Sequence, residues 1–342
     1  MVPSKVGTRP VQVWSKLLPN PEVHLLSSSS PPSFLIPIPF NARSPPTATM
    51  TAEADGAPPP LLQVLDSHIH LWPSSHLSPT HHGWMTPGHQ LARRHGLTDY
   101  AAAVCASSPT VQQQQNQRQP HLLGVVYVET DRYLPSVWPR SKSSNEDNIQ
   151  APGAVIDSGS NGITRQRSRT LLEDWAKGPL DELRFLRRIV EGNADADVDG
   201  GSSDRDGPPL LALVVWAPLH LNPDLIKLYL EIAEEVAGEK TWARIAGFRY
   251  LIQGIRQEEE MKNLVESPDW LDNLRSLSQG RGGRGWSFDV GVDVRSGGVW
   301  QVEVAADMVG KVRERERKSG EGAGSSVRFI LSKSKFFFLS WN

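Results

Sequence analysis

The stretch that decides the fold is an apolar run that ends in two histidines, Val64-Leu65-Asp66-Ser67-His68-Ile69-His70-Leu71-Trp72. A short apolar run of this kind indicates a buried β-strand. Because side chains alternate along a strand, His68 and His70 project from the same face. Two neutral imidazoles on one face are a ready pair of ligands for a divalent metal ion. A His-x-His pair is weakly specific on its own, and two polar residues at a strand end are the structural alternative.

The rest of the chain alternates predicted strands with predicted helices. Five further apolar runs predict strands, at Leu122 to Val128, Leu210 to Trp216, Ile245 to Ile252, Trp286 to Val292 and Val327 to Leu331. Helical patterns lie between them, at Thr98 to Ala106, Pro179 to Glu191, Asn222 to Gly238, from Ser267 onward, and at Val299 to about Val312. This alternation is typical of right-handed βαβ units, and at this length it predicts an α/β fold of the TIM (β/α)8 barrel type. The barrel is expected to be incomplete, with about six of its eight strands present.

Several segments do not fit the barrel pattern. Residues 1–60 are rich in Ser and Pro and predict a disordered leader, with an organelle transit peptide or a true start at Met50 as alternatives. Polar stretches near 139–168 and 193–207 predict disordered insertions. The tail at 332–342 has no periodicity, which suggests a mis-predicted gene end. The barrel domain is therefore expected to span 61–331.

Composition excludes some classes of protein. The chain has 342 residues and a formal net charge of −2, which gives no argument for binding nucleic acid. No apolar stretch approaches the ~18 residues that a membrane-spanning helix needs. The single cysteine, Cys105, cannot form an internal disulfide and favours a reducing compartment. We expect a cytoplasmic protein, or a mitochondrial one if residues 1–49 are a transit peptide.

Four segments, in this order along the chain, resemble the amidohydrolase-related (amidohydrolase 2) family of metal-dependent-type TIM-barrel hydrolases. They are Leu65 to Trp72, Gly124 to Thr130, Gly247 to Gln253 and Phe288 to Asp293. The chain is most similar to the fungal sugar-lactone and dicarboxylate-lactone hydrolases of this family, from about Leu61 to Leu331. The resemblance implies a lactonase that opens a small-molecule lactone with water. It also implies a divalent metal, zinc or manganese, although some relatives are thought to work without one.

Six residues are candidates for the site. His68 and His70 would hold the metal. Arg249 lies within an apolar strand, where a guanidinium needs an anionic or carbonyl partner, so it is a candidate for substrate binding, with a structural ion pair as the alternative. Glu129 follows the second strand and would assist, unless it is an N-cap or a surface acid. Trp72 and Trp84 are candidate pocket walls, and the His-rich loop that contains Trp84 is expected to be solvated.

The chain lacks residues that the family uses after its sixth and eighth strands. In the family, the sixth strand continues into a histidine and a Lys-Pro signature, and a catalytic Asp follows the eighth strand. Neither has a counterpart after Leu331, so the truncated chain is expected to be inactive or nearly so. The alternatives are a metal-dependent decarboxylase on the same scaffold and a non-functional fragment. The oligomeric state stays open.

Overall fold

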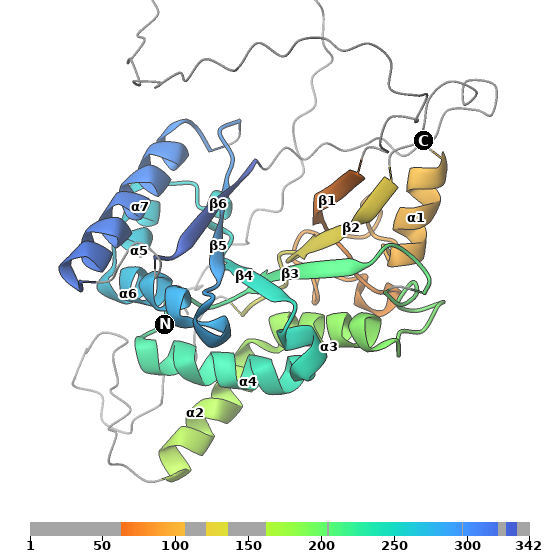
Figure 1. Cartoon of the computed structure of the whole chain (residues 1–342), viewed down its shortest axis with the longest axis horizontal. Helices are drawn as coiled ribbons and strands as arrows, with labels where there is room; N and C mark the ends of the chain where they lie inside the picture. The colour runs from red at the N-terminus through yellow and green to blue at the C-terminus, as the bar shows by residue number, and fades with distance from the viewer. Residues whose placement is uncertain are drawn as a thin grey trace, which may run out of the picture. The chain divides into compact units, whose positions relative to one another are not determined.

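The computed structural model describes residues 63–106, 121–135, 162–203, 205–295, 297–320 and 326–333. These residues form six β-strands and seven α-helices and belong to one compact unit, Leu61–Asn342 (Figure 1). The strands are β1 Gln63–Ile69, β2 His121–Val128, β3 Leu210–Trp216, β4 Ile245–Arg249, β5 Ser287–Val292 and β6 Arg328–Lys333. The helices are α1 Leu97–Ala106, α2 Gly162–Trp175, α3 Lys177–Glu191, α4 Pro223–Trp242, α5 Glu258–Val265, α6 Pro268–Ser276 and α7 Trp300–Lys318.

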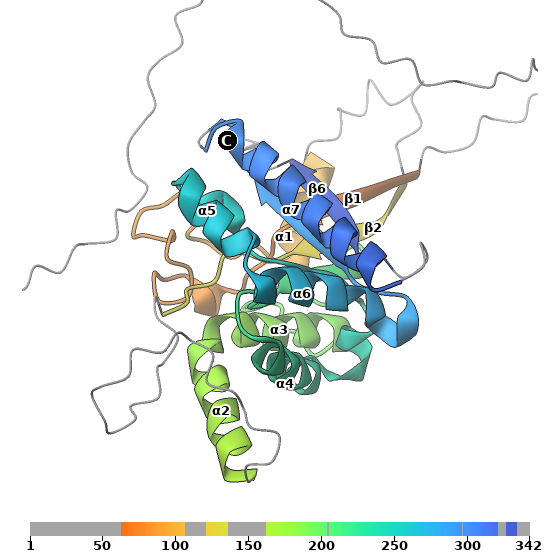
Figure 2. The ribbon, with the colours of Figure 1, turned by 90° about the vertical axis from the view of Figure 1, so that its left-hand side faces the viewer.

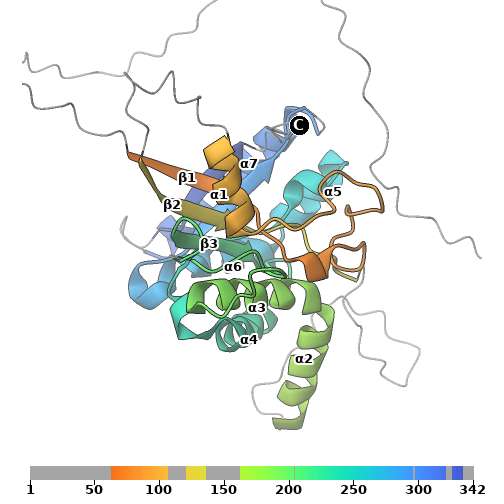
Figure 3. The same ribbon diagram turned by 90° about the vertical axis from the view of Figure 1, so that its right-hand side faces the viewer.

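The six strands form one parallel sheet in sequential order, from β1 to β6. The sheet curls into a half-barrel, with β1 and β2 at one end and β5 and β6 at the other (Figures 1 and 3). The predicted α/β class is therefore confirmed, and the parallel sheet of six strands is consistent with part of a barrel-like fold. In such sheets functional side chains gather where the strands end, because the carboxyl ends of parallel strands share one edge.

Helices α3, α4, α6 and α7 lie together on the outer side of the sheet (Figure 2). The core between the helices and the sheet is apolar, and in α3 it includes Leu183, Leu186 and Ile189, all of them at most 1% exposed. These residues recur at the three-residue spacing that places side chains on one face of a helix. Gly192 ends α3 in a left-handed conformation, with φ of 77°, as a residue without a Cβ readily does.

Strand β1 corrects the expectation of a buried strand. Val64 and Leu65 are 37% and 47% exposed, and only Ile69 at the end of the strand is buried. The reason is position: among the described strands β1 pairs with β2 alone, so its first residues lie at an edge of the sheet. The buried Ile69 lies between the two histidines, which are themselves half-buried.

Two helices extend beyond their predicted ends. In α4, Asn222 caps the first turn by accepting a hydrogen bond from the Leu225 amide, as predicted. Gly238 leaves helical geometry, with φ of 69° and ψ of 163°, but the helical segment resumes and ends at Trp242. The charged stretch after Val312 continues α7 to Lys318, because one of its acids, Glu316, is buried and accepts a hydrogen bond from the Val327 amide.

The polar stretches differ from the expected insertions. Residues 162–168, within the first predicted insertion, belong to α2, and 136–161 lie outside the described residues. The loop at 193–207 is packed: Asp199 is 2% exposed and forms two hydrogen bonds with Arg188, of 2.7 and 2.9 Å. A Cβ on Gly96 would lie 2.4 Å from Gly200 Cα, so this loop presses against the start of α1.

The predicted leader and most of the predicted tail cannot be placed. Residues 1–62 and 334–342 lie outside the described residues, whereas Ser332 and Lys333 continue β6. Within the described part of the chain, none of the helices is long and apolar enough to cross a bilayer.

Candidate active site at the carboxyl edge of the sheet

Charged and imidazole side chains meet where the strands end. His68 lies near the end of β1, and His70 directly follows it. Glu129 follows β2, and Arg249 is the last residue of β4. Asp289, on β5, is the register partner of Arg249. Four of these five residues were predicted from the sequence. Asp289 was not among the six candidates.

The two histidines lie side by side. Their ring centroids are 4.9 Å apart, with the rings nearly perpendicular. The Nδ1 atom of His70 lies 2.9 Å from the Val128 carbonyl oxygen, which can only accept, so Nδ1 carries the proton and Nε2 the lone pair. Burial, together with the charges of His68 and Arg249, lowers the pKa of His70 to about 3. Burial and Arg249 also lower the pKa of His68, so both rings are neutral at pH 7.

Arg249 is held between two carboxylates. Its Nε lies 3.2 Å from Asp289 Oδ1 and 3.8 Å from Glu129 Oε1, and all three side chains are at most 4% exposed. The guanidinium also lies against Gly291, where an added Cβ would be 2.7 Å from Nη2. The structural ion pair foreseen as the alternative is therefore present, and it places a planar cation at the edge where ligands bind in parallel sheets.

Glu129 is a buried acid and not a surface acid. It is 2% exposed, and its Oε2 accepts a hydrogen bond of 2.7 Å from the Asp131 amide. Burial raises the pKa of Glu129 to about 8, against the opposing attraction of Arg249. A carboxyl group with this pKa retains a proton near neutral pH and can act as an acid.

His68 and His70 offer two imidazoles as ligands for a metal ion. A metal-bound histidine usually donates its other ring N–H to a carbonyl or carboxylate, and His70 does so to Val128. Among the described residues, no group of three or more His, Cys, Asp or Glu side chains is arranged to hold a metal ion. The neighbouring Arg249 also disfavours a second cation by charge repulsion.

The tryptophans lie in the loops that face these strand ends. Their ring centroids are 5.5 Å apart. Trp72 is 5% exposed and donates from Nε1 to the Arg93 carbonyl, whereas Trp84 is half-buried and donates to the Thr130 carbonyl, next to Glu129. Both indole N–H groups are thus occupied by the protein. A role as pocket walls stays a prediction.

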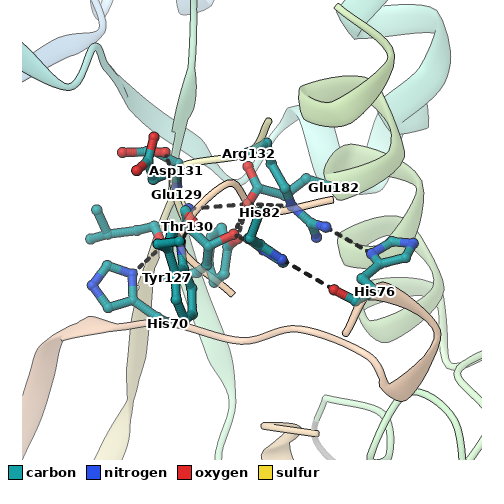
Figure 4. Close-up of polar contacts among 11 residues, drawn as sticks. His70, His76, His82, Tyr127, Glu129, Thr130, Asp131, Arg132 and Glu182 are labelled. Carbon is teal, nitrogen blue, oxygen red and sulfur yellow. Dashed lines mark hydrogen bonds and ion pairs between the residues drawn. The ribbon is translucent and has the colours of Figure 1, made fainter. Parts of the chain in front are cut away.

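The His-rich loop is not simply solvated. His82 is completely buried, and its Nε2 lies 3.0 Å from Thr130 Oγ1 (Figure 4). Its Nδ1 lies 3.2 Å from the His76 carbonyl oxygen. The expectation of a solvated loop was wrong for His82 because its partner Thr130 is 48 residues away, and no local pattern signals such a contact.

A buried acid on α3 supports the segment that carries Glu129. Glu182, 1% exposed, accepts hydrogen bonds from the Tyr127 hydroxyl (2.6 Å), the Thr130 hydroxyl (2.6 Å) and the Thr130 amide (3.1 Å) (Figure 4). Arg132 Nε donates to the same oxygen at 3.3 Å, and its Nη1 lies 2.8 Å from His76 Nδ1. The sequence places Glu182 only in the first turn of a helix, so this network was missed.

Comparison with known proteins shows that the chain is similar to a lactonase. Neither the known family models nor the solved structures contain a match to the chain. Over 250 residues the chain is 22% identical to L-rhamnono-gamma-lactonase of Scheffersomyces stipitis. The alignment covers 73% of this chain and 57% of the lactonase, so the chain spans little more than half the length of this relative. The similarity supports a lactonase-like relationship.

Proposed function

We propose that this protein is a lactone hydrolase acting on a small, sugar-derived lactone. One observation carries the proposal: the buried guanidinium of Arg249 lies at the carboxyl edge of a parallel sheet, beside two neutral imidazoles, the carboxylate of Asp289 and the carboxyl group of Glu129. A cation and an acid at such an edge suit attack of water on an ester carbonyl. The name of the related L-rhamnono-gamma-lactonase supports a sugar-derived substrate.

The proposed reaction assigns a step to each of two side chains. The oxygen of water adds to the lactone carbonyl carbon, and N–H groups of Arg249 stabilise the negative charge that develops on the carbonyl oxygen. The ring C–O bond then breaks, and Glu129 supplies a proton to the leaving oxygen, because its raised pKa keeps it protonated. The proton lost by water restores Glu129, so the product is the open hydroxy acid.

We infer that the half-barrel corresponds to the first six units of a (β/α)8 barrel of the amidohydrolase-related type. Three features support this inference: the sequential order of the parallel strands, the curl of the sheet, and the His-x-His pair where β1 ends. In this arrangement the candidate residues lie at the end of the barrel that carries active sites.

A divalent cation, zinc or manganese, would be held by His68 and His70, and it would polarise the lactone carbonyl. We expect weak zinc binding by the full chain, because two ligands hold a metal less tightly than the usual three or four. Equilibrium dialysis should show less bound zinc in His68→Ala than in the wild type. His121→Ala, which removes an exposed histidine at the start of β2, is the control. Equal zinc content in all three proteins would contradict the metal assignment.

The hydrolase proposal is tested with an aldono-1,4-lactone and the purified full chain. Release of acid measures the rate of ring opening. Calorimetry measures binding of the lactone independently of its turnover. We expect Arg249→Met to lower the rate at least about a hundredfold, as loss of one charge-stabilising donor does. Arg165→Met, on the surface of α2, should not change it. Absence of ring opening by the wild type would contradict the proposal, whether or not the lactone binds. Carbon dioxide release from aromatic acids would point to a decarboxylase instead.

A further inference from the structure

A group of aromatic rings lies next to Arg249 and was not among the predicted site residues. Trp216 is the last residue of β3, His220 lies in the loop that follows, and Tyr250 follows Arg249. The ring centroids of His220 and Tyr250 are 5.2 Å apart, and those of Trp216 and Tyr250 are 6.3 Å apart and nearly parallel. We call these three residues the aromatic cluster.

The aromatic cluster belongs to the same edge of the sheet as the candidate site. Trp216 is the register partner of Arg249. The amide of Ala217, the next residue, donates a hydrogen bond of 3.2 Å to the Arg249 carbonyl oxygen. His220 and Tyr250 are half-buried, whereas Trp216 is 6% exposed.

His220 has an unsatisfied polar atom. Its Nδ1 is enclosed, and within the described part of the chain it has no hydrogen-bond partner. Leaving such an atom unpaired is unfavourable, and native proteins usually provide it with a partner such as water or a ligand. Burial lowers the pKa of His220 to about 4, so the imidazole is neutral at pH 7 and can both donate and accept. A hydroxyl group is a partner of matching chemistry.

The charges favour a neutral ligand over an anionic one. The positive charge of Arg249 is already paired with the carboxylate of Asp289, so a carboxylate on the ligand would meet a like charge there. The aromatic cluster itself is uncharged. Aromatic walls with a few polar groups are typical of sites for small, largely apolar rings that carry hydroxyls.

We propose that Trp216, His220 and Tyr250 form a subsite for the hydroxylated ring of a neutral, sugar-derived lactone, with the imidazole of His220 hydrogen-bonded to a ring hydroxyl. The inference rests on the proposed hydrolase function, and it selects a neutral sugar lactone over a dicarboxylate lactone. The ring of Tyr250, held in place by its packing against Trp216, would cover the apolar C–H side of the ligand while the ligand carbonyl points to Arg249.

The test compares three ligands on the full chain. They are a hydroxylated aldono-1,4-lactone, γ-butyrolactone, which has no hydroxyl, and a hydroxylated lactam ring that cannot be opened under the assay conditions. We expect His220→Phe, which keeps a ring but loses both nitrogens, to lower kcat/KM for the aldonolactone about ten- to a hundredfold more than for γ-butyrolactone. The dissociation constant of the lactam should rise by a similar factor. His220→Gln, which retains a donor and an acceptor, should recover part of both losses.

The control removes an aromatic side chain from a different group of rings. Trp242, in α4, contacts Trp286 and Phe248 at centroid distances of 5.5 and 6.5 Å. We expect Trp242→Leu to leave the discrimination between the two lactones unchanged, whereas Tyr250→Leu weakens lactam binding. If His220→Phe fails to fold, as judged by a thermal melt, the comparison of Tyr250→Leu with Trp242→Leu decides.

The outcomes separate this inference from the hydrolase proposal. Lactam binding that depends on His220, without turnover of any lactone, would refute the hydrolase function and support the subsite. Turnover of both lactones with equal losses in His220→Phe would refute the subsite and keep the hydrolase function. Failure of the wild type to bind the lactam, or a preference for a dicarboxylate lactone, would also overturn the inference.

Discussion

Removal of the Glu182 side chain tests whether the buried network behind the site holds the fold together. Glu182→Ala leaves Arg132 as a buried cation without its carboxylate, and it removes the acceptor of the Tyr127 and Thr130 hydroxyls. Both members of the ion pair are 1% exposed, so water does not replace the lost contact. Breaking a buried pair by removing one partner costs about 3–5 kcal/mol. The Thr130 hydroxyl keeps His82 as a second partner, which limits the further loss.

We therefore expect Glu182→Ala to lower the free energy of unfolding by about 4–5 kcal/mol, a large share of the ~5–15 kcal/mol typical of a domain. For a domain of this size the corresponding fall in Tm is about 10–20 °C. Glu182→Gln keeps the shape and one acceptor oxygen but loses the charge, so about half of this loss is expected. Urea titration followed by tryptophan fluorescence measures both variants.

The matched control is Glu258→Ala in α5, whose partner Lys262 is four residues away at 2.6 Å. Both side chains of that pair are more than a third exposed, so the expected loss is at most about 0.5 kcal/mol. A loss below about 1 kcal/mol in Glu182→Ala would refute the reasoning. It would mean that Arg132 reaches water or another acceptor once Glu182 is gone.

Two further predictions concern titration and packing. Burial, and then the charge of Arg132, lowers the pKa of both His76 and His82 to about 3, against about 6.5 in an unfolded chain. At a pH between about 3 and 6.5 the unfolded chain binds more protons than the folded chain, so Tm should fall as the pH falls from about 6.5 toward 3. His82→Gln should flatten this dependence of Tm on pH. A Tm that rises as the pH falls through this range would contradict the prediction. Gly291→Ala places a Cβ 2.7 Å from the guanidinium nitrogen, and we expect about 1–3 kcal/mol of destabilisation and weaker lactone binding by calorimetry. Gly310→Ala in α7, where an added Cβ meets nothing, should be neutral or stabilising by up to about 1 kcal/mol, and equal effects at the two glycines would refute the packing argument.

Strand boundaries and site residues could be predicted where the apolar pattern of the sequence matches the burial of the strand. The boundaries of β3 were predicted to the residue, because Leu210 to Trp216 is an unbroken apolar run and a central parallel strand is covered on both faces. His68, His70 and Glu129 were found because each is a polar residue at the end of an apolar strand. Arg249 was found because it is a charged residue within the predicted strand Ile245 to Ile252, although β4 in fact ends at Arg249. The parallel arrangement then brings such positions together without any further signal.

Other features depend on partners that are distant in the sequence. Nothing near Glu182 distinguishes it from the half-buried Asp181 that precedes it, since the partners of Glu182 lie 50 or more residues away. Helix α2 was missed because its buried residues, Leu172 and Trp175, occur only near its end. The Arg188 contact that anchors the loop at 193–207 is likewise invisible in a Gly- and Asp-rich sequence. In these cases tertiary contacts override local propensity.

The sequential order of the strands has a consequence for how the chain is made. Each described strand pairs with the strand before or after it, as in Leu213 with Ile245, so the sheet contains no pairing between the first and last segments of the described chain. Such a sheet can be assembled by adding one βα unit at a time as the ribosome delivers it. Each new strand docks on an edge that already exists, and the cost of closing a loop is limited to the intervening helix. Folding during synthesis is therefore compatible with this topology from β2 onward.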